Sequence, residues 1–414
     1  MLRWHSVRSV SPSTMKELAR RYEAGAISLL EDLVRIPSVN GRQGETKVSR
    51  RILAEADRLG LKAWLTGLED DRQNVLVETG QGTRGFALVG HMDTVAEGEL
   101  EAWSHPPFAG EVVASRLFGR GAADNKAGIA CGLYALALLK DNALIDPDLH
   151  RAVLAGVVDE ESGANSPLGV RFLLQQGALR VEAAIYTYAS DVICIGHRGL
   201  LRLMLRAKGQ AVHSGSREWD SGGIGINAVT GLAEVLLGLE QIVLETSAHP
   251  AFEGLSNKVT PGTLIRGGDW QGMVPAWAEA CVDVRLLPGC TPNDMITAFE
   301  AVIRAVEGRR PGLKVEMEKQ VILPAATIPG DHRLVALAQT VTQEHTGRTW
   351  PAEGAGPANE GYMLIEAGIP TLCGFGPRGG NTHAPDEWVD LDSIVPTIAM
   401  FSEIIQSYLV QEES

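Results

Sequence analysis

The sequence is poor in cysteine and has no long apolar run, and each shortage excludes a class of protein. Among its 414 residues are five cysteines, an odd number with no C-x-x-C pair, which argues against a disulfide framework and a thiolate zinc site. No run of about 18 apolar residues marks a membrane span, and residues 1–14 are too polar for a signal peptide. We therefore expect a cytoplasmic protein with no membrane partner.

Positive charge is also in short supply. Lys and Arg number 37 against 51 Asp and Glu, and the net charge of -14 argues against nucleic acid as a partner. The remaining composition, 45% hydrophobic and 21% charged, is that of a soluble globular protein, and the length suggests two or three structural units.

Strands and helices alternate over the first 198 residues. The hydrophobic pattern predicts helices over 15–37, 45–60 and 125–140 and buried strands over 74–80, 85–91 and 151–160. This alternation predicts an α/β fold, with a three-layer catalytic domain around a mixed, mostly parallel sheet. Its chemistry is expected at the carboxyl ends of the strands.

The pattern changes after residue 198 and returns after residue 321. The segment between predicts strands over 200–209, 279–287 and 313–322 and helices over 225–242 and 291–308. We expect a catalytic domain in two segments, 1–198 and 322–414, and an inserted α+β lid of ferredoxin-like type over 199–321. The apolar faces of the lid helices exceed what a small sheet needs to cover, so we also expect a homodimer through the lid.

Two motifs place polar side chains directly after a strand or a glycine turn. "GHMDTV" puts His91 and Asp93 behind the strand over 85–91, with Asp93 in reach to orient the histidine, although a surface-loop histidine is the alternative. "LFGRGAADNKAG" puts Asp124 at the start of a helix. A plain N-cap aspartate is one alternative. A nucleotide-binding loop is another, but Asp124 replaces its third glycine and would repel phosphate.

The stretch "VVDEESG" sets three acids, Asp159, Glu160 and Glu161, at the end of a strand. A metal ion would neutralise them, with one glutamate binding the ion and its neighbour facing a bound water; an exposed acidic loop is the alternative. "GGNTHAPDE" adds His383 and Glu387, with a surface histidine as its alternative. Taken as a set, these nitrogen and oxygen ligands suit zinc, cobalt or manganese.

The order, spacing and flanks of "GHMDTV", "GRGAADNKAG", "DEESG", "AVHSG" and "THAPDE" resemble a known family. It is the family of metal-dependent deacylases and exopeptidases, which includes acetylornithine deacetylase, succinyl-diaminopimelate desuccinylase, aminoacylase and glutamate carboxypeptidase. The resemblance extends from about residue 16 to 410.

The resemblance implies a role for each matching residue. His91 would bind one metal ion, and Asp124, after which the peptide bond to Asn125 would be cis, would bridge two metal ions. Glu161 and His383 would bind the second ion. Glu160 would be the general base, and Asp93 would orient His91. In the lid, His213 would stabilise the oxyanion, often across a dimer, and Arg285 would lie near the substrate. A hydrogen-bonded turn is the alternative for His213, and a structural ion pair is the alternative for Arg285.

The chain departs from the family pattern at several positions. Thr187 and Tyr188 lie where an acidic ligand of the first metal is expected, and Asp191, a few residues later, is the nearest substitute, with a turn residue as the alternative. Gly272 and Leu323 replace usual lid residues, and Asn359 replaces a usual aspartate. Arg378, in "GPRGG", is the candidate that with Arg285 would bind a substrate carboxylate; a structural arginine is its alternative.

These residues together predict a metal-dependent hydrolase of a C–N bond, most simply the amide of an N-acyl amino acid or small peptide. Hydrolysis of an aromatic amine and a non-catalytic metal-binding scaffold are the alternatives, and Glu160 argues against the scaffold because a scaffold needs no base. The expected cofactor is one or two divalent ions, zinc foremost, then cobalt or manganese. The expected partner is a small substrate that bears a carboxylate.

Overall fold

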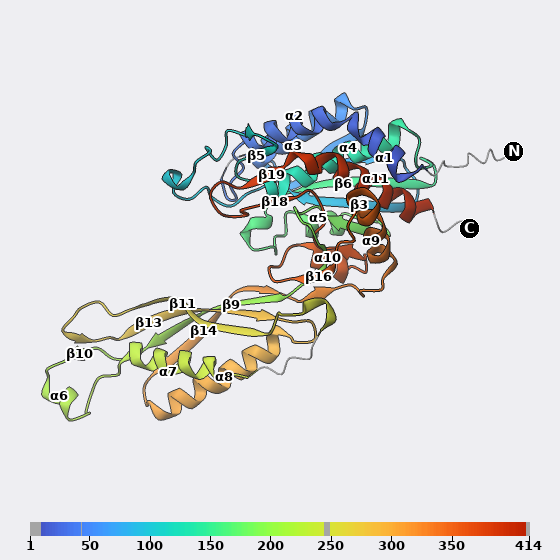
Figure 1. The fold of residues 1–414 in the computed structure, drawn as a ribbon. Helices are drawn as coiled ribbons and strands as arrows, with labels where there is room; N and C mark the ends of the chain where they lie inside the picture. Colours follow the sequence, from blue (N-terminus) through green and yellow to red (C-terminus); the bar gives the residue numbers. More distant parts are fainter. Residues whose placement is uncertain (1–9, 43, 244–248, 411–414) are drawn as a thin grey trace. The chain divides into compact units, whose positions relative to one another are not determined.

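The computed structural model describes residues 10–42, 44–243 and 249–410, which form two compact units (Figure 1). The first unit comprises Met1–Gly196, Thr327–Gly354 and Asn359–Ser414. The second comprises His197–Ala326 and Ala355–Ala358, where the sequence predicts a lid over 199–321. The chain thus leaves the first unit twice, for the long stretch 197–326 and for the short stretch 355–358, and each time returns to it.

A six-stranded sheet forms the centre of the first unit. Its strands are β1 (Lys62–Glu69), β2 (Arg72–Thr79), β3 (Arg84–His91), β6 (His150–Val157), β7 (Ala183–Tyr186) and β17 (Thr371–Leu372). Their spatial order is β1-β2-β6-β3-β7-β17, and the four strands from β6 to β17 run parallel. β1 and β2 are antiparallel to their neighbours, so the predicted mixed, mostly parallel sheet is confirmed.

Helices cover both faces of this sheet and complete three layers (Figure 1). They are α1 (Pro12–Arg20), α2 (Glu23–Arg35), α3 (Glu45–Arg58), α4 (Ala127–Asp141), α5 (Val170–Gln175), α9 (Arg333–Thr346), α10 (Gly361–Glu366) and α11 (Ile394–Val410). α2 and α11 pack on α4 on one side, and α10 packs on α5 on the other. Leu391–Val410 is apolar and long enough to cross a membrane, but 78% of the stretch tested is buried, as in the core helix of a globular unit.

The single helix predicted over 15–37 is wrong, because the chain breaks it into α1 and α2. The amides of Arg21 and Tyr22 bond the carbonyls of Leu18 and Ala19, three residues back, and so tighten the last turn of α1. The helical pattern of side chains continues across this break, which explains why periodicity alone does not reveal it.

The chain also forms two smaller sheets from strands outside the main sheet. β18 (Gly379–Gly380), β19 (Trp388–Asp390), β5 (Arg116–Phe118) and β4 (Glu111–Val113) form a four-stranded sheet in that order. β15 (Ala326–Thr327), β8 (Ile193–His197) and β16 (Ala352–Ala355) form a three-stranded one. The first of these joins the segment before Asp124 to the segment around His383.

The second unit has the β-α-β-β-α-β order of a ferredoxin-like fold. Its elements are β9 (Gly199–Lys208), α7 (Ala228–Glu240), β11 (Lys258–Gly267), β13 (Trp277–Leu286), α8 (Pro292–Arg309) and β14 (Lys314–Leu323). The strand order is β11-β13-β9-β14, antiparallel throughout. Outside this sheet, α6 (Arg217–Asp220) precedes α7, and β10 (Val212–His213) pairs with β12 (Met273–Val274).

The apolar faces of α7 and α8 are buried in the core of this unit. Leu232 and Val235 of α7 and Met295 and Phe299 of α8 pack with inward-facing residues of the sheet, such as Leu203. The sheet therefore covers these faces, and they do not by themselves support the expected dimer.

Candidate metal centre

The site lies at the carboxyl ends of neighbouring parallel strands in the first unit. His91 ends β3 and pairs with Val157 at the end of β6. On the other side of β3, Val89 pairs with Tyr186 at the end of β7. Because these ends share one edge of the sheet, the polar segments that follow them converge there.

The backbone of Asp93, rather than its carboxylate, orients the buried His91 ring. Nδ1 of His91 lies 3.0 Å from the Asp93 carbonyl oxygen and 3.6 Å from carboxylate oxygen Oδ1. A carbonyl only accepts, so Nδ1 has the proton and Nε2 faces Asp124. The Asp93 carboxylate instead accepts the amides of Glu160, at 3.2 Å, and Glu161, at 2.9 Å. It therefore fixes the acidic loop.

Asp124 is held by Glu387, a residue to which the sequence reasoning gave no role. Buried Glu387 accepts the backbone amides of Ala123 and Asp124, both at 3.0 Å, and pairs with Arg120 at 2.7 Å. The Asp124–Asn125 peptide is cis, as the resemblance implies. The opposite charges of Arg120 and Glu387 in two separate candidate motifs are the signal that could have suggested this pairing.

The Asp124 carboxylate has the geometry of a bridge. Its Oδ1 lies 2.7 Å from Nε2 of His91, and its Oδ2 lies 3.3 Å from Nε2 of His383. Oε1 of Glu161 lies 3.0 Å from the same nitrogen of His383. Ligand atoms of His91, Asp124 and Glu161 all lie within 4.8 Å of one another, so these side chains could hold a divalent cation.

The three adjacent acids of "DEES" diverge, as their charges require. Asp159 is bound by Arg72 and Ser166, each at 2.6 Å. Buried Glu160 accepts the hydroxyl of Tyr188 at 3.3 Å. Glu161 faces His383. Asp159 is thus structural, Glu161 belongs to the ligand cluster, and Glu160 lies beside that cluster.

The charges and burial of these side chains favour a cation at this cluster. Burial raises the pKa of Glu160 well above its ordinary value, and repulsion from Glu161 adds to this. Hydrogen bonds to Asp124 and Glu161 raise the pKa of His383 to about 10. Burial alone would raise the pKa of Asp124, but His91 and His383 lower it to about 2. Carboxylates that hold protons on imidazoles in this way fit a metal ion, which would replace those protons.

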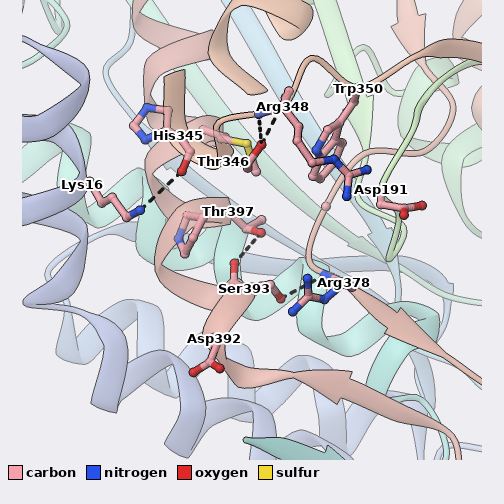
Figure 2. Close-up of a pocket in the computed structure, with 13 residues that line it drawn as sticks. Lys16, Asp191, His345, Thr346, Arg348, Trp350, Arg378, Asp392, Ser393 and Thr397 are labelled. Carbon is pink, nitrogen blue, oxygen red and sulfur yellow. Dashed lines mark hydrogen bonds between the residues drawn. The ribbon is translucent and has the colours of Figure 1, made fainter. Parts of the chain in front are cut away.

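Asp191 and Arg378 lie outside the ligand cluster and line another pocket, of ≈ 300 Å³, in the first unit (Figure 2). Both side chains are exposed. Arg378 donates from Nε to Asp390 at 2.9 Å, and its backbone amide donates to Ser393. Trp350 and Met400 also line this pocket.

Asn359 is buried, and backbone groups engage both ends of its amide. Its Nδ2 donates to the carbonyl of Cys373 at 2.5 Å, and its Oδ1 accepts the amide of Gly361 at 2.9 Å. The next residue, Glu360, has a fully buried carboxyl group that the sequence reasoning missed. Neither of its oxygens has a hydrogen bond of normal geometry within the described residues.

His213 and Arg285 belong to the second unit. His213 is exposed on β10, and its Nδ1 accepts the amide of Gly215 at 3.1 Å. Arg285 lies on β13 and donates to Asp283 at 2.8 Å. Because Nδ1 of His213 accepts a hydrogen bond, its Nε2 is left as a donor. Arg285 forms a structural ion pair with Asp283.

An aspartate that faces two histidines, with paired glutamates beside it at the carboxyl edge of an α/β sheet, is the ligand arrangement of a metal-dependent hydrolase of the metallopeptidase and amidohydrolase class. Residues 87–407 match the model of peptidase family M20/M25/M40, and the chain belongs to this family. The acetylornithine deacetylase of Proteus mirabilis is 29% identical over 94% of this chain and 98% of its own. That of Klebsiella pneumoniae is 28% identical over 84% and 88%.

Solved structures share the fold at lower identity. The M20 family metallo-carboxypeptidase Sso-CP2 from Sulfolobus solfataricus matches with a TM-score of 0.75, at 18% identity, over 93% of this chain and 99% of that one. The YXEP protein of Bacillus subtilis, a dinuclear metal-binding peptidase of the M20 family, matches with a TM-score of 0.67, at 17% identity, over 94% and 99%. The catalytic unit with an inserted second unit is therefore the architecture of this family.

Proposed function

We propose that this protein hydrolyses the amide bond of an N-acyl amino acid or small peptide, with Glu160 as the general base. The main support is the placement of Glu160 beside a cluster in which Asp124 faces two histidines through opposite oxygens. The similarity to acetylornithine deacetylases over nearly the whole chain supports an acylated amino acid as the substrate class.

The residues divide the chemistry between them. A divalent ion on this ligand set supplies Lewis acidity, which polarises a carbonyl and acidifies water. Buried Glu160 takes a proton from the attacking water and returns it to the leaving nitrogen. The Asp93 carboxylate accepts the backbone amide of Glu160 and so keeps Glu160 in place. The ion pair of Asp159 with Arg72 anchors the start of the same loop. His213 is the proposed donor to the oxyanion.

Zinc is the proposed ion, with cobalt and manganese as alternatives, because the ligands are imidazole nitrogens and carboxylate oxygens. A cytoplasmic location is part of the same proposal, and the five free cysteines support it.

The test is metal-dependent turnover on a panel of N-acyl amino acids. Glu160→Gln should keep its metal content and lose about 10² to 10⁴ in kcat, because only the base is removed. Glu161→Gln should lose metal, because it removes a ligand. Metal content by plasma mass spectrometry and kcat on the same samples separate the two. Full activity and full metal content in both variants would contradict the assignment.

Recognition of a substrate carboxylate by Arg285 and Arg378 is a further part of the proposal. Both guanidinium groups are engaged by aspartates, so a substrate carboxylate would have to compete with Asp283 or Asp390. If Arg378 binds the substrate, Arg378→Lys lowers kcat/KM because a point charge cannot reproduce the bidentate contact. Arg378→Ala then loses most of the preference for acid over amide substrates. The control is Arg348→Ala, which removes another arginine of the same pocket. If Arg378→Ala keeps the same preference for acid substrates as this control, Arg378 has a structural role and does not bind the substrate.

A further inference from the structure

The segment that follows β7 decides how many ions the centre can hold. β7 lies beside β3, which His91 ends, so Thr187, Tyr188 and the residues up to Asp191 start from a strand end that borders the cluster. A ligand that completes a site on the Oδ1 side of Asp124, opposite His383, would be expected from this segment.

Thr187 is turned away from the cluster. Its hydroxyl donates to Oδ1 of Asn125 at 3.0 Å. The space around it is closed, since a Cβ atom on Gly90 or Gly128 would lie 2.7 or 2.5 Å from that hydroxyl. Asp191 is exposed and lines the pocket of Arg378 (Figure 2). Neither side chain is placed to complete a metal site beside His91.

Tyr188 is the residue of this segment that faces the cluster. Its ring centroid lies 5.6 Å from that of His91, and its hydroxyl donates to Glu160. The ring also stacks on Tyr186, with centroids 5.3 Å apart and an interplanar angle of 23°. A tyrosine hydroxyl ordinarily keeps its proton at neutral pH, and one that donates to the base is no substitute for a carboxylate ligand.

The ligand count is therefore unequal on the two sides of Asp124. His91, Asp124 and Glu161 offer three ligand atoms that lie within 4.8 Å of one another, enough for one zinc-like ion. His383 lies 3.3 Å from Asp124 and 3.0 Å from Glu161. Divided between two ions, the described residues would leave only His91 and Asp124 on the Oδ1 side.

We propose that each chain holds one divalent ion tightly, on the cluster of His91, Asp124 and Glu161 with His383 beside it, and that Tyr188 occupies the place of a second-site ligand and positions Glu160 instead. The positioning of Glu160 rests on the function proposed above, whereas the number of ions does not.

Calorimetric titration of chelator-treated protein with Zn²⁺, with metal content by plasma mass spectrometry, tests the ion count. Wild type should bind one equivalent tightly, with no second equivalent within about a hundredfold of that affinity. Tyr188→Glu, which restores a carboxylate, should bind two. Tyr186→Phe, the matched control on the adjoining tyrosine, should bind one. Two equivalents of similar affinity in wild type would overturn the inference, and binding of none would contradict the proposed function itself.

Tyr188→Phe tests the positioning role and covers the case in which Tyr188→Glu does not fold. The variant should keep one equivalent of metal, keep its KM and lose about tenfold in kcat, the size expected for one hydrogen bond to a charged group. Loss of the metal would make Tyr188 a ligand, and an unchanged kcat would remove its role toward Glu160; either result contradicts the proposal.

Discussion

Asp159, Glu160 and Glu161 are adjacent in the chain, yet the hydrogen bonds of their side chains go to different partners. Arg72 and Ser166 hold Asp159, Tyr188 donates to Glu160, and Glu161 faces His383. The sequence predicts the division of labour because three close carboxylates cannot share one environment. It does not predict which partner each acid takes, since Arg72 and Tyr188 come from elements remote in sequence.

Glu360 is the residue whose chemistry the sequence conceals most completely. Its carboxyl group is buried, and its pKa is raised to about 8, by burial first and then by the negative charge of Asp93, partly offset by His91. Its charge in turn raises the pKa values of Glu160 and Tyr186. In the sequence it is one more glutamate beside a glycine.

We predict that Glu360→Gln changes the pH dependence of stability. The folded protein holds the Glu360 proton more tightly than the unfolded chain, whose pKa is near 4.5, so wild type loses stability as pH rises from about 4.5 to about 8. Glutamine cannot ionise. The Tm difference in favour of Glu360→Gln should therefore grow over that range in chelator-treated protein. The exposed Glu366→Gln is the control, and equal pH profiles for all three proteins would refute the prediction.

At the scale of elements, periodicity predicts the long helices and buried strands, because their side chains face one core. The predicted helix over 291–308 is α8, and the predicted strand over 200–209 is β9. Strand β11 is missing from the prediction because it is a sheet edge that is largely exposed, contains Pro261 and has an irregular register, so no alternation marks it. Edge strands and helix breaks depend on tertiary contacts that local pattern does not encode.

The turn that presents Asp124 gives an element-scale prediction. Glu387→Gln should leave buried Arg120 without its charge partner and so destabilise the fold by about 3–5 kcal/mol. It should also weaken metal binding by about 10- to 100-fold, because Glu387 fixes the backbone of a ligand. Urea unfolding and chelator competition measure the two effects.

The matched control is Glu111→Gln, which breaks the more exposed ion pair with His105 and should cost about 1 kcal/mol or less. A loss of stability no larger than in this control, with unchanged metal affinity, would show that the Glu387 contacts do not hold Asp124.

At the scale of the whole molecule, the predicted homodimer needs a different basis from the one that the sequence suggests. The helix faces of the second unit are buried in its own core. Other apolar side chains of that unit are exposed, among them Leu237 at 62%, Ile265 at 56% and Trp270 at 77%. Exposed apolar side chains of this size are a common feature of protein interfaces.

Light scattering of the wild-type protein should give twice the mass of one chain. The double variant Ile265→Lys with Trp270→Lys should give a lower mass.

His213 gives the sharpest test of assembly, because the resemblance implies that it stabilises the oxyanion, often across a dimer. Its Nδ1 accepts a backbone amide, so Nε2 bears the proton and can donate to an oxyanion.

Glu160→Gln and His213→Ala should each be nearly inactive. In a two-fold dimer with exchanged histidines, a mixed dimer has one site with both Glu160 and the partner's His213 intact. Unfolding, mixing and refolding the two variants together should therefore restore about a quarter of wild-type activity, since about half the dimers are mixed and half their sites complete. If His213 serves its own chain, both sites of the mixed dimer lack one group and no activity returns.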